Sequence, residues 1–299
     1  MLMAMLVRVR VASACTALVA TLAVACGGGA GAAPSSARID RFDADRAFAE
    51  LRAQVALGPR PAGSAASRTL AERLRRALPG GHLSPVPGGL RNVVGGLPGR
   101  GRPILVGAHY DTKDIPGFVG ANDGAGGVAV VLELSRALRA GRRPCDRRVR
   151  FVLFDGEESP AGSTDFLRDG LRGSRADAAA NADRTHAMVL VDFVADRDLS
   201  IPREAGSSRP LWARLRASAT AVGAGRVFPN RTGRTVLDDH VPYMAAGVPA
   251  IDVIDFDYPY FHTPEDTLDK VSPRSLDLVG ETLVELLRRM SRETCPRPY

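Results

Sequence analysis

The chain alternates between two patterns of apolar residues. In some segments the apolar residues recur every three or four positions, which predicts amphipathic helices. These segments are residues 43–57, 65–78, 124–139, 211–222 and 275–290. Other segments are short, continuous apolar runs, at residues 103–108, 148–154, 188–191 and 248–254. Continuous apolar runs are typical of strands buried on both faces. The order of elements therefore indicates an α/β fold with a largely parallel sheet between helices.

The first forty residues differ from the rest in composition. Arg8 and Arg10 precede an apolar stretch that is too short to span a bilayer, which is typical of an export signal. We therefore predict a signal peptide at residues 1–25, a flexible Gly/Ala/Ser-rich tether at 26–40 and one domain at 41–299. No internal repeat or further change of composition follows residue 40.

The apolar stretch ends with small residues directly before Cys26. This pattern resembles a bacterial lipoprotein signal, in which the cysteine is lipidated and becomes the new N-terminus. Ala23 stands where leucine is usual, and secretion after cleavage at the Ala-x-Ala of residues 23–25 is the alternative. Both interpretations place the domain outside the cytoplasm, either as a membrane-anchored lipoprotein or as a secreted protein.

Charge and cysteine content narrow the range of partners. The formal net charge is +7, but the arginines are scattered along the predicted helices. A nucleic-acid-binding face usually shows basic residues clustered with aromatic ones, so no nucleic-acid partner is predicted, and the lipid anchor is the only predicted membrane contact. Cys145 and Cys295 form an even pair in a predicted exported domain, which favours a disulfide. Two free thiols are the alternative.

Histidine and acidic residues follow the predicted strands. The crevice beyond the carboxyl ends of parallel strands is where ligands bind in open α/β sheets. Imidazole and carboxylate groups are ligands of zinc, so we predict a site there for one or two zinc ions. The residues at these strand ends are His109, Asp111, Glu157, Glu158 and Asp192.

The spacing within this set predicts individual roles. Positions two apart on a strand face the same side, so we expect the Asp111 carboxylate to accept a hydrogen bond from the far nitrogen of His109. In the adjacent pair Glu157 and Glu158, one residue is expected to ligate a metal while the other acts as general base. A solvated acidic turn is the alternative for this pair.

Three further segments complete the candidate site. Asp123 precedes a predicted helix and is either its N-cap or a carboxylate that bridges two cations. Asp239 precedes a short helical stretch and is either an N-cap or a group on the substrate side of the site. His262 lies in an irregular segment and is a candidate last ligand. The aromatic residues beside it, Tyr260 and Phe261, are expected to wall a substrate pocket.

Taken in order, these motifs resemble those of the zinc aminopeptidases of the bacterial leucyl aminopeptidase type (peptidase clan MH), in which the glutaminyl cyclases form a branch. The matching segments cover essentially the whole domain. They are residues 57–64, 108–112, 122–124, 155–158 and 262–267. The resemblance implies a three-layer α/β/α sandwich around a central mixed, mostly parallel sheet of about eight strands.

The resemblance also implies a role for each site residue. Glu157 would be the general base. The implied ligands are His109 and Asp192 for one zinc ion, Glu158 and His262 for a second, and Asp123 as the bridge between the two.

Two activities are compatible with this ligand set. The sequence favours an exported aminopeptidase with two zinc ions, which removes N-terminal residues from peptides or proteins. Phe261 stands where cyclases usually carry tryptophan, and residues 263–270 follow the peptidase pattern more closely. In both branches the partners are peptide or protein N-termini.

The alternative activity is that of a glutaminyl-peptide cyclotransferase with one zinc ion, which forms N-terminal pyroglutamate. This activity is favoured by three segments that resemble the cyclase branch: Lys113, residues 118–121 and residues 238–242. In this branch Asp192 and Asp238 would join a hydrogen-bond network near the substrate amide. A third hypothesis is an inactive binding homologue. It is disfavoured because every ligand position carries a competent residue.

Overall fold

The structure of the protein is a computed structural model, and it describes residues 40–296. The predicted signal peptide at residues 1–25, the predicted lipidation site Cys26 and all of the predicted tether except Asp40 lie outside the described residues. No helix within residues 40–296 is long and apolar enough to cross a membrane.

A single mixed sheet forms the centre of the described part of the chain. Its strands are β1 (His82–Val86), β2 (Leu90–Leu97), β3 (Arg100–His109), β4 (Arg147–Phe154), β5 (Ala187–Asp192) and β6 (Ala250–Ile254). They lie in the order β1-β2-β4-β3-β5-β6. The pairs β4–β3, β3–β5 and β5–β6 are parallel, whereas β1–β2 and β2–β4 are antiparallel. The prediction of a mixed, mostly parallel sheet is confirmed.

The number of strands differs from the expectation of about eight, because the sheet has six strands within residues 40–296. Residues 201–205 run beside residues 227–234 and exchange several main-chain hydrogen bonds with them. Only an isolated parallel bridge forms there, between Arg203 and Thr232. The donors Ile201, Arg203 and Ala205 are two residues apart, but their acceptors at residues 227, 231 and 234 are four and three apart. Because the spacing does not match, the two segments do not form a regular ladder.

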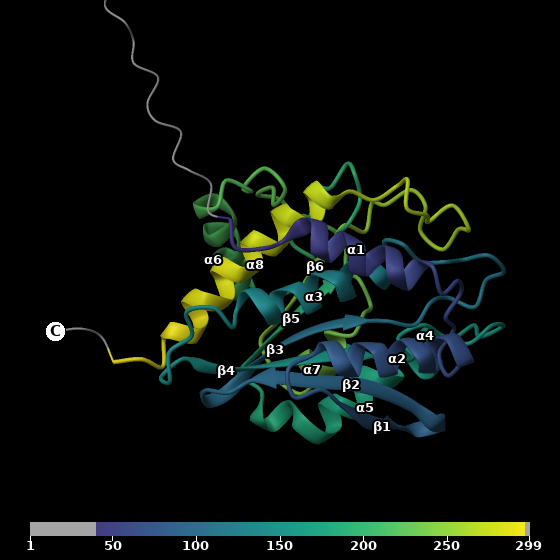
Figure 1. Cartoon of the computed structure of the whole chain (residues 1–299), viewed down its shortest axis with the longest axis horizontal. Helices are drawn as coiled ribbons and strands as arrows, with labels where there is room; N and C mark the ends of the chain where they lie inside the picture. Colours follow the sequence, from purple (N-terminus) through teal and green to yellow (C-terminus); the bar gives the residue numbers. More distant parts are fainter. Residues whose placement is uncertain (1–39, 297–299) are drawn as a thin grey trace, which may run out of the picture. The chain divides into compact units, whose positions relative to one another are not determined.

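Helices cover both faces of the sheet, which confirms the three-layer architecture (Figure 1). One face is covered by α1 (Ala44–Val55), α2 (Ala65–Ala77), α3 (Ala125–Ala137), α6 (Arg209–Ala221) and α8 (Pro273–Arg292). The other face is covered by α5 (Arg172–Asn181) and α7 (Val241–Ala245). Successive side chains of a strand point to opposite faces, so Phe151 packs in the first core and Val152 in the second.

Short elements connect these layers. They are α4 (Phe166–Asp169) and the 3₁₀ turns Pro87–Gly89 and Ala182–Arg184. Among the described residues, four helices, α1, α2, α4 and α8, begin at side-chain caps. In α1, for example, Asp43 accepts a hydrogen bond from the Arg46 N–H group. Such caps satisfy N–H groups that have no partner within the helix.

Helix α3 begins differently, and its start brings the candidate site together. Gly124 occupies the N-cap position with φ of 90°, a conformation that favours glycine. One turn later, a Cβ atom on Gly127 would lie 2.2 Å from the main-chain oxygen of Val191. The absence of a side chain therefore lets the first turn of α3 contact the end of β5, beside Asp192.

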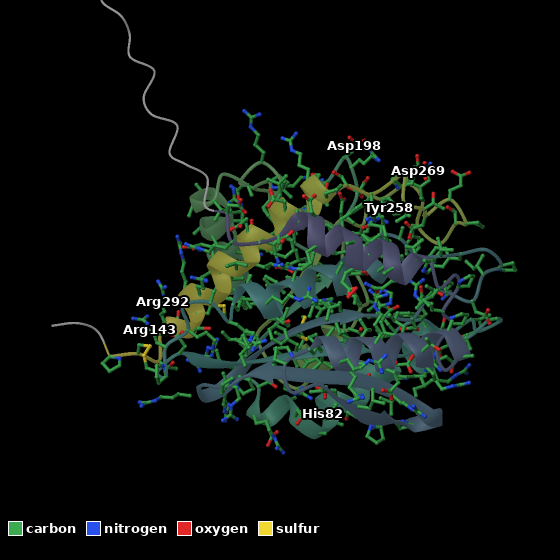
Figure 2. All side chains as sticks on the ribbon, viewed as in Figure 1. His82, Arg143, Asp198, Tyr258, Asp269 and Arg292 are labelled. Atoms are coloured by element: carbon green, nitrogen blue, oxygen red, sulfur yellow. A yellow bond between two sulfur atoms is a disulfide. The ribbon has the colours of Figure 1, made fainter. Side chains whose placement is uncertain are left out.

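A disulfide joins Cys145, in the approach to β4, to Cys295, which follows α8. Figure 2 shows this bond in yellow beside Arg143 and Arg292. It links two segments that are 150 residues apart in the sequence.

Candidate metal centre

The carboxyl ends of the parallel strands carry the residues that the sequence singled out. His109 is the last residue of β3 and Asp192 the last residue of β5. Glu157 and Glu158 follow the end of β4 closely. Asp123 comes from the turn before α3, and His262 from the irregular segment after β6. Parallel strands end at the same edge of the sheet, so these side chains meet there.

The ligand atoms form two groups that share Asp123. In the first group, Nε2 of His109 lies 3.2 Å from Oδ1 of Asp123 and 3.4 Å from Oδ1 of Asp192. In the second group, Nε2 of His262 lies 2.9 Å from Oε1 of Glu158 and 3.5 Å from Oδ2 of Asp123. Asp123 thus offers one oxygen to each group, as a bridging carboxylate would.

Both groups have the chemistry of a zinc site. Within each group the ligand atoms lie within 4.8 Å of one another. Nitrogen and carboxylate oxygen ligands suit zinc, and buried carboxylates require a partner or a cation. Asp123 is 2% exposed, and its Oδ2 atom has no hydrogen-bond partner among the described residues. The arrangement of the side chains therefore fits a bound metal ion.

The contacts of Asp111 differ from the prediction. Nδ1 of His109 lies 3.1 Å from the main-chain oxygen of Asp111 and 3.7 Å from its carboxylate. The carboxylate instead accepts hydrogen bonds from the N–H groups of Glu157 and Glu158, each at 3.2 Å. Because β3 ends at His109, Asp111 lies beyond the strand, where the alternation of sides no longer holds. Asp111 therefore orients the Glu157–Glu158 turn.

The helix-cap alternatives for Asp123 and Asp239 are not observed. Gly124 is the N-cap residue of α3 and His240 that of α7, and neither helix has a side-chain cap hydrogen bond within the described residues. The acidic-turn alternative for Glu157 and Glu158 also fails, because these side chains are 8% and 3% exposed and so are not solvated.

Burial and neighbouring charges shape the proton affinities of the carboxyl groups. Burial, together with the charge of Glu158, raises the pKa of Glu157 well above its ordinary range. Burial also raises the pKa of Asp192 to about 7, although the neighbouring His109 opposes this shift. Without a cation, Glu157 and Asp192 therefore favour their protonated forms, and a bound cation would favour their ionised forms.

A cavity of about 270 Å³ opens onto this centre. Its polar wall contains Asp123, Glu157, Glu158, Asp192, Thr235, Asp238 and His262. Its apolar wall contains Phe166, Phe193, Val236, Leu237, Ile254, Phe256 and Phe261. The predicted pocket residue Phe261 lines it, but Tyr260 and Asp239 do not. Tyr260 packs against Tyr258 outside the cavity, and Asp239 is fully buried in the protein behind Asp238.

Two cavity residues have unusual backbone conformations. Phe193 and His262 have φ of 45° and 51°, although neither is glycine. Strained backbone of this kind persists only where the surroundings hold it in place, and it concentrates at functional sites. The ring of Phe261 stacks on that of His262 with centroids 3.8 Å apart, which helps to hold the imidazole.

The sequence did not identify the residues that hold the ligands from behind. Asp266 accepts hydrogen bonds from the N–H groups of Asn122 and Asp123, at 2.9 and 3.0 Å, and from the Tyr258 hydroxyl at 2.7 Å. The buried guanidinium group of Arg60 donates to main-chain oxygens of the loop before Asp123, including that of Val119 at 2.8 Å. The only sign of these supporting residues in the sequence was that they are charged and lie in predicted turns.

Of the three segments that resemble the cyclase branch in sequence, two contact the second ligand group and the third lines the adjoining cavity. Nζ of Lys113 lies 3.0 Å from Oε2 of Glu158, opposite the oxygen that faces His262. The ring of Phe118 meets that of His262 edge-on, with centroids 6.1 Å apart. Asp238 lines the cavity beside this group.

Comparison with known proteins gives matches over most of the domain. The sequence model of the family described as Peptidase family M28 matches residues 92–287. Aminopeptidase YwaD of Bacillus subtilis is 29% identical over 187 residues, which are 60% of this chain but only 39% of that protein. Glutaminyl-peptide cyclotransferase of Bos taurus is 27% identical over 245 residues, or 67% of each chain. The solved structure of an Acidobacteriales bacterium glutaminyl cyclase is 30% identical, with a TM-score of 0.73, and the match covers 87% of this chain and 99% of that one.

Proposed function

Because this chain belongs to peptidase family M28, we propose that it is a zinc-dependent glutaminyl-peptide cyclotransferase, which converts N-terminal glutamine of peptides to pyroglutamate and releases ammonia. The sequence alone favours the other activity of these relatives, that of an aminopeptidase. Both activities act on peptide N-termini at the same centre, so the choice rests on what surrounds the ligands.

The observation that carries the proposal is that two cyclase-like segments contact the second ligand group and a third lines the same cavity. Lys113 pairs with Glu158, Phe118 packs on His262 and Asp238 lines the adjoining cavity. These residues come from the three segments that resemble the cyclase branch. A cyclase with one zinc ion would use this group, which consists of Asp123, Glu158 and His262. The ring of Phe261 keeps an aromatic wall where cyclases usually have tryptophan.

The comparisons include relatives of both activities. The match to the solved Acidobacteriales glutaminyl cyclase is 30% identical and covers 99% of that chain. The match to aminopeptidase YwaD covers 39% of that protein. The match to the solved cyclase thus extends over nearly the whole of that chain.

A zinc ion held by Asp123, Glu158 and His262 would polarise the side-chain amide carbonyl of an N-terminal glutamine. Glu157 lines the same cavity and is placed to accept a proton as the α-amine attacks that carbonyl carbon. A carbon–nitrogen bond forms to the α-nitrogen, and the bond to the amide nitrogen breaks. Glu157 then returns the proton to the departing nitrogen, which leaves as ammonia.

The remaining walls of the cavity favour cyclisation over hydrolysis. Apolar side chains such as Phe193, Val236 and Ile254 exclude water from the reacting amide. Asp192 and Asp238 lie on the polar side, where they can accept hydrogen bonds from the amide NH₂ group. The α-amine of the substrate is then the nucleophile closest to the amide carbon.

One observation favours the aminopeptidase as a second candidate. Asp123 directs its two oxygens to different groups, and the first group, which contains His109 and Asp192, is complete. Two zinc ions bound in this way would activate water for hydrolysis of the first peptide bond. The number of zinc ions bound therefore bears directly on the activity.

We also propose that the enzyme works outside the cytoplasm, with Cys26 as a lipid anchor. The sequence of residues 1–26 resembles a lipoprotein signal, although Ala23 stands where leucine is usual. The disulfide between Cys145 and Cys295 agrees with an oxidising compartment. Partitioning of the mature protein into detergent would support the anchor, whereas a mature protein that stays in the aqueous phase would exclude it.

Mass spectrometry of matched peptides tests the proposed activity. The protein is incubated with zinc and with peptides that differ only in an N-terminal glutamine or leucine. We expect loss of ammonia from the glutamine peptide and an unchanged leucine peptide. Release of the first residue from the leucine peptide would establish the aminopeptidase instead. No change in either peptide at full zinc loading would favour an inactive homologue.

A further inference from the structure

Behind Asp238 lies a buried group of polar side chains that do not line the cavity at the metal centre. These are Asp252, His240 and Glu204, which are 0%, 1% and 2% exposed. Asp252 is in the middle of β6, and Glu204 is in the turn before α6. Buried ionisable groups are costly unless they are paired, so their arrangement requires a physical reason.

Glu204 is the fixed end of this group. Its carboxylate accepts hydrogen bonds from the N–H groups of Gly206 at 2.7 Å, Ser207 at 2.6 Å and Val236 at 3.3 Å. Burial alone would raise the pKa of Glu204, but hydrogen bonds from His240 and from these main-chain groups bring it to about 2. Glu204 is therefore an ionised carboxylate in a rigid setting.

The ionised Glu204 orients His240. Nε2 of His240 lies 3.4 Å from Oε2 of Glu204, so the carboxylate holds a ring proton on Nε2. Nδ1 of the same ring lies 3.7 Å from Oδ2 of Asp252. A carboxylate that fixes the tautomer and orientation of an imidazole in this way is the usual support of a functional histidine.

Asp252 connects His240 to Asp238. Neither carboxyl oxygen of Asp252 has a hydrogen-bond partner among the described residues. Burial, together with the charges of Asp238, Asp192 and Glu204, raises the pKa of Asp252 well above its ordinary range. A carboxyl oxygen of Asp252 lies within 4.8 Å of one of Asp238. Two buried carboxylates this close repel each other, so a proton on Asp252 would remove the repulsion and provide a donor toward Asp238.

A second connection runs through the backbone. The hydroxyl of Ser207 accepts a hydrogen bond from the N–H group of Asp252 at 2.9 Å, and Ser207 belongs to the same turn as Glu204. The turn is therefore attached to the strand that carries Asp252. A displacement of Glu204 would therefore move Asp252 through both His240 and Ser207.

We propose that Glu204 and His240 are positioning residues that act through Asp252 to hold the Asp238 carboxyl group at the wall of the cavity. This inference rests on the proposed function, because it assigns these residues a purpose in the reaction at the same cavity. Asp238 lines the cavity, and it also belongs to the group formed with His240 and Asp252.

The first test compares two buried glutamates. Glu204→Gln removes the charge that orients His240. Glu281→Gln is the matched control, because Glu281 is equally buried and also accepts main-chain hydrogen bonds, from Arg41 and Phe42, but lies on α8 outside the cavity. We expect kcat to fall by about 10- to 100-fold in Glu204→Gln, with KM, zinc content and folded fraction close to those of the control. Equal kcat in both variants would overturn the proposal.

The second test asks whether Asp252 acts as a neutral donor. Asp252→Asn keeps two N–H donors without charge, whereas Asp252→Leu removes them. We expect Asp252→Asn to retain kcat within about threefold and Asp252→Leu to lose about 10- to 100-fold. Equal loss of kcat in both folded variants would show that a charged carboxylate is needed and would contradict the proposed role.

An infrared measurement separates this proposal from the proposed activity. A protonated carboxylic acid has a carbonyl stretching band distinct from that of a carboxylate. We expect a band at neutral pH in the wild type that is lost in Asp252→Asn and shifted in Glu204→Gln. If this band were present in an enzyme without ammonia release, the cyclase assignment would fail while the hydrogen-bond network stood. Absence of the band would overturn the neutral Asp252.

Discussion

Asp123 is the residue that couples the two halves of the candidate site. Its Oδ1 atom faces His109 and its Oδ2 atom faces His262, while Asp266 holds the main chain on which it is carried. The Asp123 side chain does not cap α3. The start of the helix therefore fixes where Asp123 lies, while both carboxylate oxygens stay free of hydrogen bonds to the helix. A metal ion in either group depends on this one side chain.

Glu157 is expected to move protons without holding the metal. Glu157→Gln keeps the size of the side chain but cannot accept a proton, so turnover should fall by about 10²- to 10⁴-fold. Zinc content, measured by elemental analysis of the purified protein, should equal that of the wild type. Turnover like that of the wild type would remove Glu157 from the mechanism.

Glu204 should contribute to stability in a defined range of pH. Its ordinary pKa is 4.5 and its pKa in the folded protein is about 2. Because the folded value is lower, the stabilisation is fully present above pH 4.5 and is lost as the pH falls toward 2. The difference amounts to about 3 kcal/mol. The urea midpoint of the wild type should therefore fall more steeply over this range than that of Glu204→Gln. Parallel curves would contradict the pKa assigned to Glu204.

At the scale of elements, the contact of α3 with β5 sets the distance between Asp123 and Asp192. Gly127→Ala would place a methyl group against the main-chain oxygen of Val191. We expect a loss of about 1–3 kcal/mol in unfolding free energy and a lower zinc affinity, measured by competition with a chelator. In Gly225→Ala, the control, the added methyl group would make an ordinary contact with Thr220. Equal effects of both substitutions would show that the helix start is not tightly packed.

The elements that the sequence predicts are those with a strong pattern. The continuous apolar run at residues 148–154 became β4, and the amphipathic pattern at residues 275–290 became α8. Strands β1 and β2 escaped prediction because proline and glycine interrupt their pattern, as at Pro85 and Gly95. Helix α5 was missed because it is rich in alanine and has few large apolar residues.

At the candidate site, too, the residues with a strong sequence pattern were predicted and the others were not. Ligands such as His109 and Asp192 directly follow apolar runs, so their position at the sheet edge was predictable. The supporting residues were not, because their partners come from distant parts of the chain. Asp252, for example, belongs to the group formed with His240 and Glu204. An acidic residue within the apolar run of β6 was the signal that could have revealed it.

At the scale of the whole molecule, the disulfide between Cys145 and Cys295 closes most of the domain, because the two cysteines are 150 residues apart. A cross-link over so long a loop restricts the unfolded chain strongly. Replacing both cysteines by serine should lower the unfolding free energy by about 2–5 kcal/mol, measured by urea titration. Unchanged stability would show that packing of α8 alone holds the C-terminal segment.

The central claim is that zinc bound at the Asp123–Glu158–His262 group supports cyclisation of N-terminal glutamine. The most direct measurement is a titration of the metal-free protein with zinc while ammonia release from a glutamine peptide is followed. We predict that the rate rises with the first equivalent of zinc and then stays constant, and that Asp123→Ala shows no rise. Zinc binding at this group without ammonia release, or a rate that needs a second equivalent and yields a free N-terminal residue, would contradict the claim.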